Sequence, residues 1–203
     1  MSTQDVATLF AALSGGEDAS LRGLHERLAA EAEANELLDV AYRTVDSPVG
    51  LLLIAATDRG LVKVSFEREG HDEVLDKLAT AVSPRILRAP RRLDAAAHEL
   101  DEYFAGRRHQ FDLPLDLQLA HGFRRAVIEH LRDIGYGHTE SYADVAQACG
   151  SPRAVRAVGT ACATNPLPLV LPCHRVVRSD GSLGRYGGGD EAKRWLIELE
   201  ADG

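Results

Sequence analysis

Residues 167–176 read Leu-Pro-Leu-Val-Leu-Pro-Cys-His-Arg-Val, and this stretch constrains the fold more than any other. It places the Cys173 thiol next to an imidazole and a guanidinium, directly after an apolar segment punctuated by proline. Only the thiolate attacks, and cationic neighbours or a histidine can lower a thiol pKa from about 8.5 toward neutrality. The alternative is that Cys173 is one more buried, small apolar residue. The surrounding sequence has to decide between these two interpretations.

The composition is that of a globular protein, with 203 residues of which 45% are hydrophobic and 27% charged. Its three cysteines, Cys149, Cys162 and Cys173, lack CxxC pairing, which argues against a disulfide framework and against a structural zinc site. No run approaches the roughly 18 apolar residues of a membrane span, and no positive charge precedes the short apolar run at residues 6–13. We therefore expect a cytoplasmic protein without a membrane segment or a metal.

The net charge of −8 is distributed unevenly along the chain. Residues 1–40 hold two basic and eight acidic side chains, which is −6, whereas residues 121–180 hold seven basic and five acidic ones, which is +2. Such asymmetry concerns partners and solubility and not the fold. The second half of the chain can therefore face nucleic acid despite the acidic total.

Helical spacing is present within residues 1–38, interrupted at Ser14-Gly15-Gly16. After this break, apolar residues recur at intervals of three and four: Leu21, Leu24, Leu28 and Ala32. We expect residues 1–38 to form an acidic helical extension that packs on the protein or contacts a partner, and the sequence leaves that partner unknown.

From residue 40 the pattern becomes that of strands, separated by turns at Ser47-Pro48 and Asp58-Arg59-Gly60. The predicted strands cover residues 40–45, 51–57 and 61–66. Helical spacing then returns over about residues 72–82 and 93–104. These segments predict one α/β unit built on a small antiparallel sheet.

Pro114-Leu115-Asp116-Leu117 is the predicted crossing to a second unit, because helical patterning dominates after it. Gly135-Tyr136-Gly137 ends the first helix of that unit, predicted over residues 122–134. One face of this helix should contain Phe123, Ala126, Val127, His130, Leu131 and Ile134. The second unit is therefore predicted to be mainly α.

Two short helices are predicted on either side of Gly150-Ser151-Pro152, over residues 141–149 and 152–163. Ser141 suits an N-cap with Asp144 as its capping-box partner, and Pro152 suits the first turn of the second helix. The pair is typical of a helix-turn-helix.

The second of these helices carries Arg153 and Arg156 among small residues, so it could lie close to a nucleic-acid groove. The alternative is that the small residues permit tight helix packing and that the arginines are solvated.

These motifs together resemble a known family, the methylated-DNA–protein-cysteine methyltransferases, or O6-alkylguanine-DNA alkyltransferases. The residues that carry the resemblance are Arg156-Ala157-Val158-Gly159, Asn165-Pro166, Pro172 to Val176, Tyr186, Gly188-Gly189, Trp195-Leu196 and Glu200. The resemblance covers residues 121–203, and less closely residues 40–117. It implies a ribonuclease-H-like α/β domain over residues 39–117 and a winged-helix-like domain with a helix-turn-helix over residues 118–203. Residues 1–38 have no counterpart in the family's minimal form.

The activity that the resemblance implies is repair of DNA by direct reversal. The alkyl group of O6-alkylguanine, and as a second candidate of O4-alkylthymine, would move irreversibly to Cys173. Because a thioether is a poor leaving group, the protein would act once as a suicide methyltransferase, without cofactor or metal. Displacement at a saturated carbon needs a soft nucleophile and no oxyanion hole. The implied partner is double-stranded DNA bound by a monomer.

The resemblance also implies the catalytic roles. Cys173 would supply the sulfur, His174 would act as base through a bridging water, and Glu200 would orient the imidazole. Asn165 would tie the preceding turn to the active segment, and Tyr142 would hydrogen-bond the flipped base. Ordinary alternatives are a structural histidine, a solvated glutamate, an Asx turn at Asn165 and an aromatic core residue at position 142.

In the DNA-binding role that the resemblance implies, Arg156 would enter the base stack in place of the extruded nucleotide, with Arg153, Ala154 and Val155 beside it. Its alternative role is a phosphate contact. Arg175 is expected to be structural, and Ser179-Asp180-Gly181 is expected to be a hairpin turn.

The substrate pocket would be lined by Tyr186, Gly187, Gly184 and Pro168. At Gly187 the family often has Ser or Ala, so any hydroxyl contact is lost here and the preferred alkyl group is not predicted.

Two rival functions remain. A lesion-binding but non-catalytic alkyltransferase-like protein would lack the reactive cysteine, which Cys173 argues against. A thiol hydrolase would also use Cys173 and His174, but papain-like sites draw their histidine from far along the chain.

Overall fold

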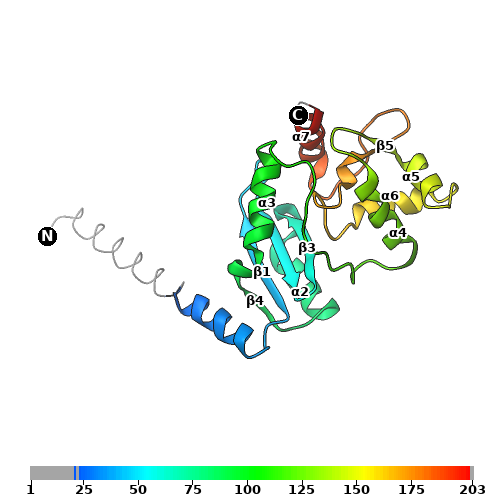
Figure 1. Ribbon diagram of the computed structural model, residues 1–203. Coiled ribbons are helices and arrows are strands. Elements are labelled where there is room, and N and C mark those ends of the chain that lie inside the picture. Colours follow the sequence, from blue (N-terminus) through cyan, green and yellow to red (C-terminus); the bar gives the residue numbers. More distant parts are fainter. Residues whose placement is uncertain (1–20, 22, 202–203) are drawn as a thin grey trace, which may run out of the picture.

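The computed structural model describes residue 21 and residues 23–201, which form a helical extension, an α/β unit and a mainly helical unit (Figure 1). Residues 21 and 23–34 are helical, as predicted, and the predicted helical segment before them lies outside the described residues. Ala29 and Ala32 are buried, whereas Leu21, Leu24 and Leu28 are more than half exposed. The apolar stripe therefore packs on the protein only at its C-terminal end.

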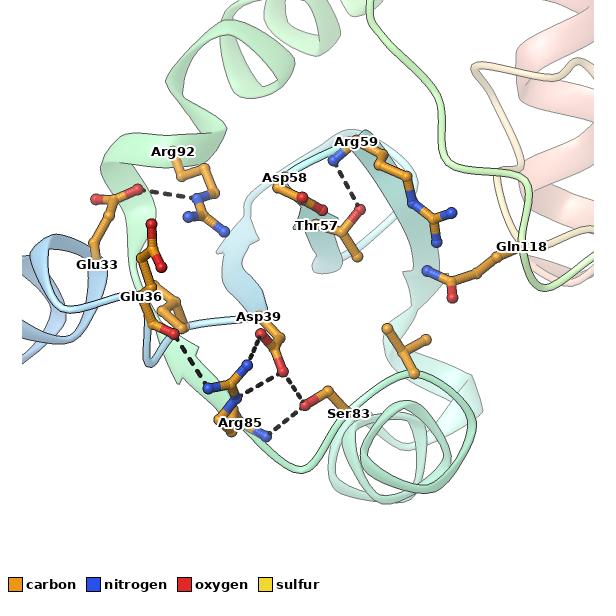
Figure 2. Close-up of a pocket in the computed structure, with 12 residues that line it drawn as sticks. Glu33, Glu36, Asp39, Thr57, Asp58, Arg59, Ser83, Arg85, Arg92 and Gln118 are labelled. Atoms are coloured by element: carbon orange, nitrogen blue, oxygen red, sulfur yellow. Dashed lines mark hydrogen bonds and ion pairs between the residues drawn. The ribbon is translucent and has the colours of Figure 1, made fainter.

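Charged side chains join the end of the extension to the α/β unit around a recess (Figure 2). Arg92 Nε donates to Glu33 Oε1 over 3.0 Å. Arg85 Nε donates to Asp39 Oδ2 over 2.8 Å, and its Nη1 donates to the Glu36 carbonyl over 3.1 Å. The hydrogen bond from Arg85 lowers the pKa of the Asp39 carboxyl. Arg85 and Arg92 thus fix the position at which the helical extension joins the α/β unit.

The sheet has the order β3-β2-β1-β4, and its first three strands match the prediction: β1 (Val40–Val45), β2 (Leu52–Thr57) and β3 (Gly60–Phe66). These three pair antiparallel. The expectation of a purely antiparallel sheet is wrong, because β4 (Ile86–Arg88) pairs parallel with β1. Strand β4 has only three residues and lies between Pro84 and Pro90. Such a short segment shows no alternation of apolar and polar residues, so it could not be predicted from the sequence.

One helix covers each face of the sheet, because strand residues alternate between the two faces. Helix α2 (His71–Ala81) packs Val74 and Leu78 against one face, and α3 (Asp94–Phe104) lies on the other (Figure 1). The short 3-10 helices η1 (Glu67–Glu69) and η2 (Pro90–Leu93) precede them. The core on the α3 side continues without a break into the C-terminal unit.

The crossing segment attaches to the free edge of the sheet at β3. Leu61 N donates to Pro114 O over 2.8 Å, and Asp116 N donates to Leu61 O over 2.9 Å. The Asp116 carboxylate is buried, where it accepts from Thr57 Oγ1 at 2.7 Å and pairs with Arg59 at 3.2 Å. The segment therefore both protects the strand edge and leads to the second unit.

The second unit contains the predicted helix-turn-helix, formed by α5 (Tyr142–Ala148) and α6 (Val155–Ala163) against α4 (Gly122–His130). Ser141 caps α5, because its Oγ accepts from Asp144 N at 3.1 Å and its N–H donates to Asp144 Oδ2 at 3.0 Å. Its remaining elements are η3 (Leu131–Asp133), η4 (Cys173–Arg175), α7 (Gly189–Ala201), and the parallel pair β5 (Glu140–Ser141) and β6 (Val176–Val177).

Three local predictions in this unit are wrong. Helix α6 begins at Val155, so Pro152 lies in the preceding turn and not in the first helical turn. Ala126 is exposed and Ile128 is buried on α4, since a small alanine costs little when solvated and is a poor marker of a buried face. The turn at residues 179–181 forms, but it leads into non-strand backbone, so no hairpin results there.

No helix among the described residues is long and apolar enough to cross a bilayer.

Replacing Gly60 by alanine should destabilise the protein far more than replacing Gly50. Both glycines have positive φ, +135° and +98°, but a Cβ at Gly60 would lie 2.2 Å from Pro114 O while a Cβ at Gly50 meets nothing within 4 Å. We expect Gly50→Ala to cost about 1 kcal/mol and Gly60→Ala about 1–3 kcal/mol more. Urea unfolding measures both, and equal losses would contradict the crossing contact.

Candidate active site

Asn165 holds together the loop that leads to Cys173. Its Nδ2 donates to Leu171 O over 2.7 Å, and its Oδ1 accepts from Leu167 N at 3.0 Å. Inside this loop Leu169 has a φ of +74°, a left-handed conformation that costs energy for a side chain other than glycine. The amide clamp of Asn165 therefore maintains a strained loop, and η4 begins directly after it at Cys173.

The Cys173 thiol is buried, with 2% of the residue exposed. Burial raises the pKa of Cys173 to about 11, although a hydrogen bond from Asn165 and the charge of Lys193 act in the opposite direction. The sequence left the pKa of Cys173 open, and in the free protein the cationic neighbours do not bring it toward neutrality. Desolvation of the anion outweighs the neighbours, so the resting form is the thiol.

His174 and Glu200 form a buried pair beside the thiol-bearing residue. The imidazole Nε2 lies 2.8 Å from Glu200 Oε1, and neither side chain is more than 2% exposed. Burial lowers the pKa of His174 despite the opposing effect of Glu200, so the imidazole is neutral at pH 7. A neutral imidazole facing a carboxylate carries its proton on Nε2. Its Nδ1 is then an acceptor, and this buried atom has no partner among the described residues.

Glu200 accepts from two further side chains. Arg175 reaches it with both Nε and Nη2, at 2.8 and 2.9 Å, and Tyr103 donates its hydroxyl over 2.7 Å. Burial alone would raise the pKa of Glu200, but the hydrogen bonds from His174 and Arg175 lower it to about 2. Glu200 is therefore an anion whose position is set from three directions, and Arg175 is structural, as expected.

Two residues of this cluster were missed by sequence reasoning. Tyr103 belongs to α3 of the other unit, and its burial strongly raises the pKa of its phenol. Lys193 on α7 is fully buried, donates its Nζ to Val176 O and lies 5.9 Å from the centre of the Tyr142 ring. Lysine is rarely buried, and Lys193 belongs to a helix with many charged residues. Its burial therefore could not be inferred from the sequence.

Tyr142 lies against Gly184, one of the predicted pocket residues. A Cβ at Gly184 would lie 2.0 Å from Tyr142 Oη, so the glycine permits close contact with the phenol. Burial raises the pKa of Tyr142 to about 12, with contributions from Cys162 and Cys173, so the phenol keeps its proton. Tyr186 is buried and its ring meets the His174 ring edge-on at 6.2 Å. Pro168 is buried, and Gly187 is half-buried.

The four predicted DNA contacts lie together at the start of α6. Arg153 precedes the helix in the turn, Ala154 is its N-cap, and Val155 and Arg156 form its first turn. Arg153, Val155 and Arg156 are exposed, while Val158 and Ala161 face the core. The helix therefore presents a surface of small and basic residues to solvent.

Within residues 21 and 23–201, no three His, Cys, Asp or Glu side chains gather as a metal site.

A helix-turn-helix unit that carries a buried thiol next to a His–Glu pair defines a DNA-binding protein with a nucleophilic cysteine. Residues 122–202 match the family model for the DNA binding domain of 6-O-methylguanine DNA methyltransferase, and residues 40–117 match the model for its ribonuclease-like domain. The chain therefore belongs to the 6-O-methylguanine DNA methyltransferases, and the two-domain fold predicted from its sequence is confirmed.

Similar proteins carry the name methylated-DNA–protein-cysteine methyltransferase. The protein of Mycolicibacterium paratuberculosis is 40% identical over 161 residues, which covers 79% of this chain and 92% of that protein. The constitutive protein of Bacillus subtilis is 39% identical over 160 residues, 78% and 94% of the two chains. The crystal structure of Mycobacterium tuberculosis O6-methylguanine methyltransferase is 37% identical, covers 80% of this chain and 93% of its own, and has a TM-score of 0.71.

Glu200→Gln should show a stability loss that depends on pH. Because the folded pKa of Glu200 is about 2 against an ordinary 4.5, its stabilisation is present above pH 4.5 and is lost as pH falls toward 2. The shift corresponds to at most about 3 kcal/mol. Urea unfolding between pH 6 and pH 3 should show the difference between wild type and variant shrinking as pH falls. A constant difference would contradict the ion cluster.

Proposed function

We propose that Cys173 is the residue that accepts the alkyl group. Repair of DNA by alkyl transfer to a cysteine is the activity of this family, and a relative has been crystallised in complex with DNA. The observation that carries the proposal is the His174–Glu200 pair next to the buried thiol, with Nδ1 of the imidazole lacking a partner. A second pair, His130–Glu140, lies near Cys149, because Glu140 contributes to the raised pKa of that thiol, but its side chains are partly exposed, unlike those of the buried pair beside Cys173.

In the proposed reaction the Sγ–carbon bond forms while the bond between that carbon and guanine O6 breaks. A thiol of pKa about 11 needs a base, and His174 takes its proton at Nδ1 through a water molecule. The imidazolium is stabilised by Glu200, which is already ionised. The imidazolium then gives up the proton taken from sulfur, the departing guanine takes up one proton in exchange, and the thioether product is stable. Each molecule therefore acts once.

Tyr142 is the proposed donor to the flipped base. Its phenol keeps its proton because its pKa is raised to about 12, first by burial and then by the nearby Cys162 and Cys173. Asn165 positions the loop and Tyr186, Gly184, Gly187 and Pro168 line the pocket.

Arg156 is proposed to occupy the space that the extruded nucleotide leaves, since a thiol cannot reach a stacked base. Arg153, Ala154 and Val155 would contact the DNA beside it. The exposure of Arg153, Val155 and Arg156 at the N-terminal end of α6 supports this assignment.

The proposed organisation has three parts. Residues 1–38 are an appendage outside the family, residues 39–117 the ribonuclease-like domain, and residues 118–203 the DNA-binding and alkyl-accepting domain. DNA is the partner, bound by a cytoplasmic monomer with preference for O6-alkylguanine.

Mass spectrometry of the protein mixed with duplex DNA carrying O6-methylguanine tests the acceptor. We expect one methyl group per protein on the Cys173 peptide, complete loss of transfer in Cys173→Ser, and normal transfer in the matched control Cys149→Ser. Lesion binding with an unmodified Cys173 would instead favour the non-catalytic rival, and repeated turnover of a thioester would favour a hydrolase.

Arg156→Ala should separate base flipping from chemistry. We expect the rate constant for O6-methylguanine in duplex DNA to fall about tenfold to a hundredfold, while the reaction with the free base O6-benzylguanine is unchanged. Arg91→Ala, which removes an exposed arginine of the α/β unit, is the control and should alter neither rate. An equal loss on both substrates would show that Arg156 acts on the chemistry and not on extrusion.

A further inference from the structure

The end of β3 in the ribonuclease-like unit lies directly against the proposed pocket wall. Phe66, only 2% exposed, meets the Tyr186 ring edge-on at a centroid distance of 5.4 Å and an angle of 65°. Tyr186 in turn meets the His174 ring edge-on. A ring of one unit thus reaches the catalytic pair of the other through a single intervening side chain.

The glycines after Tyr186 let the wall approach this ring. A Cβ at Gly188 would lie 2.8 Å from Cε1 and 2.9 Å from Cζ of Phe66, distances that real Cβ atoms do not adopt. A Cβ at Gly187 would lie 3.7 Å from the same ring, an ordinary contact. Gly188 has no positive φ, so its contact with Phe66 and not its backbone conformation excludes a side chain here.

Phe66 is itself held in place by its own turn. Glu69 Oε1 accepts from Phe66 N at 3.0 Å, and Glu69 Oε2 pairs with Lys63 Nζ at 3.2 Å. Because protein interiors are close-packed, the buried Phe66 ring has little room to move if a side chain is added at Gly188. The same segment also lines an open recess with Arg68 and Arg185, and Phe66 is the aromatic ring that packs against Gly188.

We propose that Phe66 is a positioning residue that sets the width of the alkyl pocket, and with it the size of alkyl group that Cys173 accepts. The proposal rests on the proposed function, in which Gly184, Tyr186 and Gly187 line the pocket. The ribonuclease-like unit, which contributes no atom to the reaction, thereby determines selectivity. The glycines at positions 187 and 188 leave the space that the Phe66 ring occupies.

A pair of complementary substitutions tests this coupling. Gly188→Ala adds a methyl group that the fixed ring cannot accommodate, so the wall moves into the pocket. Phe66→Leu removes the two ring atoms that lie closest to that methyl group. Second-order rate constants are measured on duplexes carrying O6-methylguanine or O6-benzylguanine, and the readout is the benzyl-to-methyl ratio.

We expect Gly188→Ala to lower the ratio about tenfold, Phe66→Leu to raise it, and the double variant to return within about threefold of wild type. Leu78→Ala is the control, because it weakens the same unit from the opposite face of the sheet and should leave the ratio unchanged. A ratio unaffected by Gly188→Ala, or a double variant without recovery, would overturn the proposal. If the wild type failed to alkylate Cys173 at all, the proposed function itself would be wrong; normal wild-type transfer with insensitive ratios would refute only the role of Phe66.

Discussion

The buried carboxylate of Glu200 is the constraint on which the rest of the structure depends. A charge removed from water has to be matched by partners, or its burial costs several kcal/mol. Glu200 is matched by His174 and Arg175 from η4 and by Tyr103 from α3, so one side chain joins the last helix, η4 and the ribonuclease-like unit. The two units therefore share both a polar cluster and a continuous apolar core. Separating them would leave a buried ion exposed or unpaired.

The same burial keeps the proposed acceptor thiol protonated in the free protein. Cys173 is desolvated, so its pKa rises and the resting sulfur stays protonated. His174 is also neutral, with its free nitrogen oriented by the bond that Nε2 makes to Glu200. Cys173 and His174 are therefore both uncharged in the free protein, and neither loses the stabilisation that water gives to a charge. For a protein that reacts once, a thiol that resists adventitious alkylation is an advantage.

Much of the fold could be predicted from sequence because its elements have strong periods or clear boundaries. Strands β1, β2 and β3, helices α2 and α3, and the capped helix α5 were all identified within a residue or two. The three-residue strand β4 was missed since it is too short for a period, and the start of α6 was placed too early because Pro152 suits a turn as well as a helix. Of the residues that surround Cys173, the sequence identified those that belong to the family's motifs, such as His174, Asn165 and Glu200. Tyr103 and Lys193 are ordinary residues in ordinary helices, and only packing makes them part of the site.

The sequence by itself determined the class of fold, the family, and the thiol, imidazole and carboxylate that are candidates for the chemistry, because residue type and local spacing are properties of the chain. Only the tertiary structure decided the protonation states of Cys173 and His174, since these depend on how much water the folded protein removes. It also decided that Phe66 lies against Gly188 and that Tyr103 binds Glu200. Contacts between residues about a hundred positions apart arise from the packing of two units, and no local pattern in a single sequence records them.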